Sequence, residues 1–225
     1  MFFTPYLALL HPRRWVVAVA VTVAFCCLLP AMVSAEKLDT IIDELQRSYE
    51  GIQELSADFR QETFSKTMGA TTIASGTVYF KKPGKMRWEY DEPAGDILIS
   101  DGTTIWLFQA DLNQVIMSGA DLSGSPLARN FLAGMGSIRN DFDISLADDS
   151  DEHYRLALSP KTPLPSVRQL FIDIDRVSGL VSRTHILDRL GNETKVSFST
   201  IKIEGRLDPS LFTYNPPKGV VVIRP

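Results

Sequence analysis

The sequence predicts a mainly β fold with helices (α+β), in which one large curved antiparallel sheet forms an unclosed β-barrel covered by a helical lid. Three observations support this prediction. Apolar residues recur at helical spacing over residues 36–52, they alternate with polar residues through most of 57–204, and Pro, Gly, Asn and Asp separate the alternating runs. A chain of 225 residues is long enough for one such domain.

Residues 1–35 differ in composition from the rest of the chain. They contain 26 apolar residues, both cysteines, two arginines and no acidic residue. The two arginines precede an apolar run over residues 16–29, and the small residues Ser34 and Ala35 follow it, which is the pattern of a secretory signal peptide. We expect cleavage after Ala35 and a single domain over residues 36–225.

Other interpretations of this segment fit less well. The apolar run has 14 residues, whereas a permanent helical anchor needs about 20. Lipoprotein processing requires a small residue before the modified cysteine, but Phe25 precedes Cys26. The residues around Arg13 and Arg14 do not resemble a twin-arginine motif. An uncleaved membrane anchor and a lipid-modified Cys26 or Cys27 remain as alternatives.

An amphipathic helix is expected over residues 36–52. Its apolar positions are Leu38, Ile41, Ile42, Leu45, Tyr49 and Ile52. Acidic residues and Arg47 occupy the positions between them, so one apolar stripe faces a core. Gly51 indicates where the helix ends.

The alternating segments predict ten or eleven antiparallel strands. The expected ranges are 57–66, 72–82, 85–91, 96–100, 103–109, 113–118, 142–147, 153–159, 168–176, 179–188 and 194–204. Turn residues such as those at 82–84 and 188–192 separate them. A sheet of this size curls, and a helix across its concave side can cover the apolar face.

Residues 125–134 interrupt the alternation. Pro126 can begin a helix, and Leu127 and Phe131 lie one helical turn apart. We therefore expect a short helix between the two groups of strands.

The strand expected at 85–91 separates two kinds of side chain. Met86, Trp88 and Tyr90 share one face, while charged residues at 85, 87 and 89 share the other. Two interpretations fit the first face. It is either an ordinary sheet core or a cavity for an apolar ligand, since methionine and aromatic side chains line adaptable apolar sites.

Composition and motifs argue against several functions. After residue 35 the chain has 21 Lys and Arg against 27 Asp and Glu and no cysteine, which disfavours nucleic-acid binding, disulfide scaffolds and thiol chemistry. His153 and His185 lie on different expected strands without metal-binding spacing. Asp173 and Asp175 alternate with isoleucines, as in a half-exposed strand. We expect no catalytic residues, no metal and no cofactor.

Several stretches, in this order, resemble one family. They are SADFRQ at 56–61, SGTVYFKKPGKMRWEY at 75–90, ILISDGTTIW at 97–106, PLAR at 126–129 and FTYNPPKGV at 212–220. Together, behind a signal peptide, they resemble the LolA family of periplasmic carrier proteins for outer-membrane lipoproteins. The resemblance extends over essentially all of residues 36–225.

The resemblance implies an unclosed barrel whose helical lid covers a cavity for the acyl chains of a lipoprotein. The candidate cavity residues are Phe59, Val78, Phe80, Met86, Trp88, Tyr90, Leu127 and Phe131. In the family a basic residue, commonly Arg, precedes the proline of the strand turn and helps hold the lid. Lys82 occupies that position here, and we call a residue that holds the lid in this way the latch. Because lysine lacks the rigid fork of arginine, we expect Lys82 to hold the lid less firmly, unless Arg87 or Arg60 takes over its role.

The resemblance also implies a location and partners. The protein is expected to act in the periplasm as a monomer, without binding nucleic acid. Its expected partners are acylated lipoproteins, an ABC-type lipoprotein-releasing complex of the inner membrane and a lipoprotein receptor of the outer membrane. The alternatives are another open-barrel periplasmic carrier or sensor of lipids or lipoproteins, and an envelope structural protein anchored in the inner membrane by residues 1–35.

Overall fold

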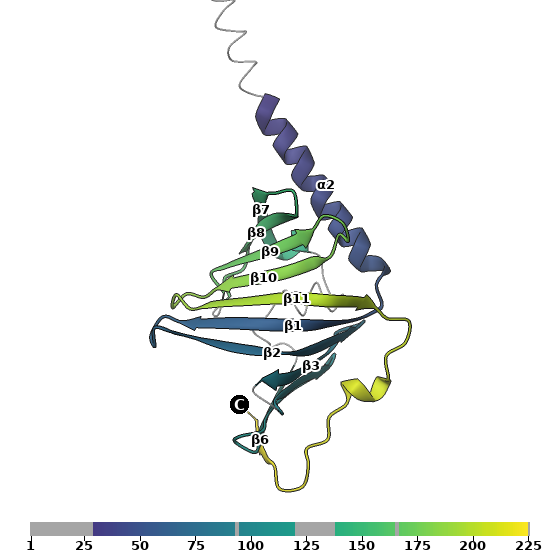
Figure 1. The fold of residues 1–225 in the computed structure, drawn as a ribbon, viewed down its shortest axis with the longest axis vertical. Coiled ribbons are helices and arrows are strands. Elements are labelled where there is room, and N and C mark those ends of the chain that lie inside the picture. The colour runs from purple at the N-terminus through teal and green to yellow at the C-terminus, as the bar shows by residue number, and fades with distance from the viewer. Residues whose placement is uncertain (1–28, 93–94, 120–137, 165–166, 225) are drawn as a thin grey trace, which may run out of the picture. The chain divides into compact units, whose positions relative to one another are not determined.

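The computed structural model describes residues 29–92, 95–119, 138–164 and 167–224. The chain divides into two units, residues 1–42 and 43–225. Within the described residues, the second unit forms one sheet of twelve strands whose two edges do not pair with each other (Figure 1). The predicted fold class, a large unclosed sheet with few helices, is therefore confirmed.

The first half of the sheet is a meander of consecutive strands. Its members are β1 (Glu54–Ser65), β2 (Ala70–Lys81), β3 (Lys85–Glu92), β4 (Ile97–Asp101), β5 (Thr104–Gln109) and β6 (Gln114–Gly119). Each strand pairs antiparallel with the next. The tight turns predicted from Pro, Gly and Asn set this connectivity, because short loops can join only antiparallel neighbours.

The second half is another meander, preceded by the short helix α3 (Ile138–Asp141). Its members are β7 (Phe142–Asp149), β8 (His153–Pro160), β9 (Gln169–Asp175), β10 (Val181–Leu187) and β11 (Glu193–Ile203). Antiparallel pairing of β1 with β11 joins the two halves and places Phe59 opposite Phe198. All eleven predicted strands are confirmed, and their ends differ from the predicted ends by at most three residues.

A twelfth strand, β12 (Val221–Ile223), was not predicted. It pairs parallel with β6, so the expectation of a purely antiparallel sheet is wrong at this edge. The full strand order is β12-β6-β5-β4-β3-β2-β1-β11-β10-β9-β8-β7. The β-branched run at 220–223 favours a strand, but its partner lies more than 100 positions earlier in the sequence.

Helix α2 (Leu29–Gly51) begins seven residues before the predicted start and ends one residue before the predicted end. Pro30 occupies its first turn, where the missing N–H of proline costs no helical hydrogen bond. Ile41, Ile42, Leu45 and Tyr49 are buried, as their helical spacing predicted. Cleavage after Ala35 stays a prediction.

The two faces of the sheet differ in chemistry, as β3 illustrates. Met86 and Trp88 are buried on one face, called here the apolar face, whereas Lys85, Arg87 and Glu89 are partly exposed on the opposite, polar face. This confirms the predicted alternation.

The C-terminal segment covers one part of the polar face. The 3-10 helix η3 (Pro209–Phe212) packs against β3 and β4, and Phe212 is fully buried. Arg87 donates a hydrogen bond from Nη1 to the carbonyl oxygen of Leu211 at 3.2 Å. This cover explains why Ile99 of β4, which pairs with Arg87 on the polar face, is buried although it does not lie on the apolar face.

Asp173 on β9 is not half-exposed, as its alternation with isoleucines suggested, but 3% exposed. Its carboxylate accepts two hydrogen bonds from Arg155 on the neighbouring strand, at 2.7 and 2.8 Å. A buried carboxylate needs such a partner. The sequence pattern could not reveal it, because Arg155 lies 18 positions away along the chain.

Gly76 lies where β2 approaches β3 too closely for any side chain. A Cβ atom at this position would lie 1.8 Å from the carbonyl oxygen of Glu89.

Replacing Gly76 by alanine is expected to lower the free energy of unfolding by about 1–3 kcal/mol, because the backbone of β3 has to shift. Urea denaturation measures this. Gly205→Ala is the control, since a Cβ atom there would meet nothing within 4 Å, and equal losses for both variants would contradict the prediction.

Candidate functional site

Four aromatic side chains cluster on the apolar face. The ring of Phe59 lies 4.8 Å from that of Trp88 and 5.2 Å from that of Tyr90, both in edge-to-face arrangement. The ring of Phe80 lies 6.1 Å from that of Trp88. Aromatic pairs at these distances attract one another beyond their hydrophobic burial. The structure thus brings four predicted cavity residues together, although they come from three strands.

Two further predicted residues complete the cluster. Val78 pairs with Trp88, and Met86 pairs with Phe80, across β2 and β3. Both are buried. Six of the eight predicted cavity residues therefore share the apolar face, while Leu127 and Phe131 lie outside the described residues. The function of these residues in binding acyl chains stays a prediction.

Residues of the second meander also contribute to this site, and they were not predicted. The ring of Phe198 on β11 lies 6.1 Å from that of Trp88. Val181 on β10 and Leu55 on β1 line a cavity with Phe198. The sequence does indicate that Phe198 is on the apolar side of its strand, because Val196 and Phe198 alternate with Lys195 and Ser197. It does not indicate that β11 pairs with β1.

Two small apolar cavities lie beside the aromatic cluster within the described residues. One has a volume of about 20 Å³, and the other about 10 Å³. Tyr49 of α2, Leu55 and Phe80 line both. Such a space holds about one water molecule, whereas sites for small organic ligands measure roughly 300–1,000 Å³. Here Tyr49 and its neighbours fill the space, so an apolar chain that enters at this point has to displace them.

Lys82 lies at the C-terminal end of α2. Its ammonium group donates hydrogen bonds to the carbonyl oxygens of Tyr49 and Glu50, the latter at 3.4 Å. The last carbonyl oxygens of a helix lack helical partners and carry partial negative charge, so a cation is favourable there. Burial lowers the pKa of Lys82, and the carboxylate of Glu50 opposes that shift. Lys82 therefore lies where a residue that holds the C-terminal end of α2 against the sheet is expected.

The two arginines considered as substitutes make other contacts. Arg87 pairs with Glu89 at 2.5 Å and bonds the C-terminal segment. Arg60 pairs with Glu62 on the polar face. Lys82 is therefore the one of these three cations that contacts the end of α2.

Tyr49 also ties α2 to the sheet through its hydroxyl group, which accepts a hydrogen bond from the backbone N–H of Val181 at 3.1 Å. Burial raises the pKa of Tyr49 to about 12.

Tyr49→Phe is expected to lower the free energy of unfolding by about 1–2 kcal/mol at neutral pH, because the buried N–H of Val181 loses its acceptor. Thermal denaturation of both proteins measures this.

The same pKa shift predicts a pH dependence. The folded protein holds the tyrosine proton more tightly than the unfolded chain, whose tyrosine pKa is about 10, so this contribution is complete below pH ~10 and is lost as pH rises toward 12. The stability difference between wild type and Tyr49→Phe should therefore shrink over this range. A constant difference would contradict the assignment.

The two histidines that follow residue 35 each lie beside an acidic side chain. His153 Nε2 lies 3.7 Å from Asp148, and His185 Nε2 lies 3.0 Å from Glu193. In the part of the chain that the structure describes, no three His, Cys, Asp or Glu residues gather closely enough to hold a metal ion. No helix among the same residues combines the length and apolar character required to cross a bilayer.

Comparisons with known proteins agree on one family. The model of the family described as "Outer membrane lipoprotein carrier protein LolA" matches residues 50–215. An outer-membrane lipoprotein carrier protein of Chromobacterium violaceum is 33% identical over 199 residues, which cover 86% of this chain and 89% of that protein. A protein of the same name from Nitrosomonas europaea is 31% identical over 206 residues, covering 91% and 97%.

A solved structure is also similar. It is an uncharacterized conserved protein from Thermus thermophilus, with a TM-score of 0.54 and 14% identity, and the match covers 84% of this chain and 99% of that one. At this identity the likeness shows the fold alone.

Proposed function

This chain belongs to the LolA family of outer membrane lipoprotein carrier proteins, and from that membership we propose that it is a periplasmic chaperone that binds the acyl chains of lipoproteins. In this proposal it receives lipoproteins from an ABC-type releasing complex of the inner membrane and delivers them to a receptor at the outer membrane. Its function is binding and transfer, without a chemical reaction.

The observation that supports this proposal most is the aromatic cluster on the apolar face, beside which Tyr49 lines a small cavity with Phe80 and Phe198. Each methylene group that leaves water gains about 0.8 kcal/mol, so the acyl chains of a lipoprotein resist crossing an aqueous compartment by tens of kcal/mol. A carrier must bury them and then release them. Side chains that fill the site when it is empty favour release, since closure of the empty site offsets part of the binding energy.

Release of a radiolabelled acylated lipoprotein from spheroplasts by the purified protein tests this function. We expect release of the acylated lipoprotein and none of a matched cargo that lacks its acyl groups. If the protein releases nothing, or binds both cargos equally well, the proposed function is wrong.

The signal peptide is tested separately by the mass of the exported protein. We propose that the exported chain begins at Glu36. A chain that keeps residues 1–35 would instead favour a protein anchored in the inner membrane.

A further inference from the structure

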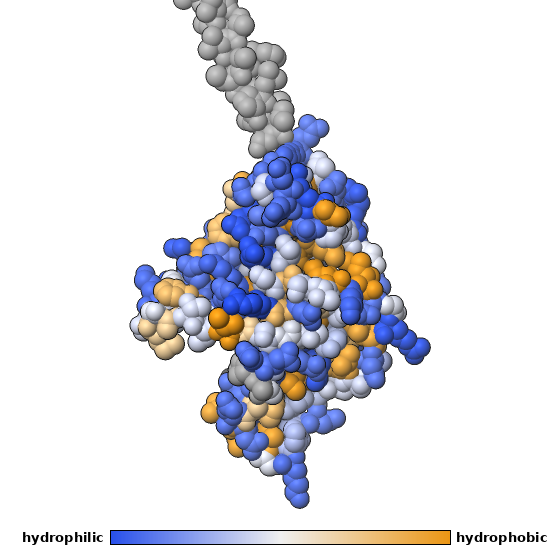
Figure 2. Space-filling view, in the orientation of Figure 1, coloured by the Kyte–Doolittle hydropathy of each residue, from blue (hydrophilic) through white to orange (hydrophobic). Residues whose placement is uncertain are grey.

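A larger pocket lies on the polar face of the sheet, on the opposite side from the aromatic cluster. It has a volume of about 340 Å³, and we call it the cationic pocket. It is lined by Arg60, Glu62, Arg155, Arg183, His185, Lys195 and Ser197. Hydrophilic side chains lie over the left-hand part of β9–β11 in Figure 2, whereas apolar side chains lie over the right-hand ends of these strands.

Strand register creates the pocket from residues far apart in the sequence. Arg60 on β1 pairs with Ser197 on β11, and Ser197 pairs with Arg183 on β10. Arg183 pairs with Asp173 on β9, which pairs with Arg155 on β8. Side chains at directly paired positions project from the same face. Three arginines therefore line one row across five strands.

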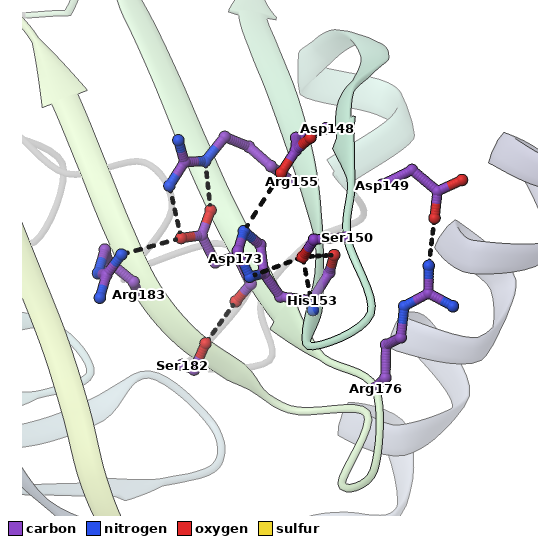
Figure 3. A network of polar contacts seen from close by, with 9 residues as sticks. All are labelled: Asp148, Asp149, Ser150, His153, Arg155, Asp173, Arg176, Ser182 and Arg183. Atoms are coloured by element: carbon purple, nitrogen blue, oxygen red, sulfur yellow. Dashed lines mark hydrogen bonds and ion pairs between the residues drawn. The ribbon is translucent and has the colours of Figure 1, made fainter.

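Asp173 holds two of these arginines in place (Figure 3). Arg155 binds its carboxylate through Nε and Nη2, and Arg183 Nη1 lies 3.5 Å from the same carboxylate. Arg183 also donates from Nε to the hydroxyl oxygen of Ser197 at 3.2 Å. The pair with Asp173 raises the pKa of Arg155. The guanidinium groups are thus oriented before any ligand arrives, which lowers the entropic cost of binding.

Among the side chains that line the pocket, cationic ones outnumber anionic ones. Four cationic side chains line it, against the carboxylate of Glu62. Asp173 and Glu193 add two carboxylates beside it, and Asp148 pairs with Arg155 across β7 and β8, so four carboxylates match the four cations. Each guanidinium group carries five N–H donors, and the side chain of Arg183 is 49% exposed.

We propose that the cationic pocket binds a phosphoryl group. Planar guanidinium groups bind phosphate oxygens in pairs, and a lysine adds a point charge. The oxygens of a tetrahedral phosphate, which is dianionic in a monoester and monoanionic in a phospholipid diester, point in several directions and can use donors that approach from several strands. The phosphoryl group can belong to a phospholipid headgroup or to a soluble phosphate ester. Because the pocket and the aromatic cluster lie on opposite faces, both can be occupied at once.

Isothermal titration of the purified protein with glycerol 3-phosphate and with inorganic phosphate tests the proposal. We expect saturable binding that weakens at least about tenfold in the double variant Arg183→Gln, Lys195→Gln, as the loss of two charge-assisted contacts predicts. The matched control is Arg168→Gln, Lys202→Gln, which removes two exposed cations outside the pocket. It should change the affinity less than about twofold. Arg155 is kept, because its removal would leave buried Asp173 without its main partner.

The source of the phosphoryl group is resolved with vesicles. Sedimentation with phosphatidylglycerol vesicles that is lost in the double variant, and absent with phosphatidylcholine vesicles, identifies a lipid headgroup. Binding of the soluble esters without sedimentation identifies a soluble phosphate compound. The proposal is overturned if phosphate does not bind, or if the double variant and wild type bind it with equal affinity. It is also overturned if a tetraglutamate peptide, which offers carboxylates in place of phosphate, binds more tightly than glycerol 3-phosphate. Thermal unfolding of both double variants checks that they remain folded.

Discussion

Replacing Trp88 by glutamate is expected to reduce the loading of lipoprotein by about a hundredfold or more. Trp88 is 9% exposed and lies at the centre of the aromatic cluster, with the rings of Phe59, Phe80 and Phe198 within 6.1 Å. A carboxylate at this position would have to leave water or hold water in the site, at a cost of several kcal/mol. Each 1.4 kcal/mol is a factor of ten in affinity. The amount of acylated lipoprotein bound per carrier measures the effect.

Two further variants separate a binding defect from a folding defect. Glu89→Gln changes the next residue on the polar face and should leave loading unchanged. Trp88→Leu keeps the site apolar, so it should load far better than Trp88→Glu, and circular dichroism reports whether each variant is folded. Equal effects of Trp88→Glu and Glu89→Gln would show that the apolar face does not bind the acyl chains.

Replacing Lys82 by leucine is expected to slow delivery of the cargo to an acceptor membrane by about tenfold. The variant loses the hydrogen bonds to the carbonyl oxygens of Tyr49 and Glu50. A cation at a partly buried helix C-terminus stabilises it by about 1–2 kcal/mol. This loss shifts the equilibrium between a docked and an undocked helix end by about a factor of ten. Transfer of radiolabelled lipoprotein from preloaded carrier measures delivery.

Lys82→Arg is the conservative control and should deliver at close to the wild-type rate. Lys66→Leu removes an exposed lysine in the turn between β1 and β2 and should have no effect. Delivery at the wild-type rate by Lys82→Leu would mean that the contact seen at the end of α2 does not act as a latch.

The meandering strands could be predicted from the sequence because the information for them is local. Alternation within 85–91 fixed which side chains of β3 are buried, and turn residues fixed where neighbouring strands end. The shared face of the six predicted cavity residues on β1, β2 and β3 could be predicted for the same reason. They lie on three consecutive strands whose pairing follows from short turns.

The features that escaped prediction depend on contacts between distant parts of the chain. Phe198 joins the aromatic cluster, and Arg183 joins the cationic pocket, through the pairing of β1, β11 and β10. Asp173 is buried because Arg155 lies on the adjacent strand. Alternation shows which face a residue occupies, but it does not show which strand lies next to it.

The junction between β1 and β11 also has a consequence for how the chain folds. Phe59 and Phe198 are nearly 140 positions apart in the sequence, yet they lie opposite each other. Contacts between such distant positions form slowly, since a long loop must close before they stabilise anything.

We expect each meander to acquire its hydrogen bonds first and the junction to form last. Pulse-labelling hydrogen exchange would then protect β2–β5 and β8–β10 before the amides that pair β1 with β11, and simultaneous protection would contradict this order. The apolar face would then be completed in the final step of folding, when Phe198 joins the aromatic cluster.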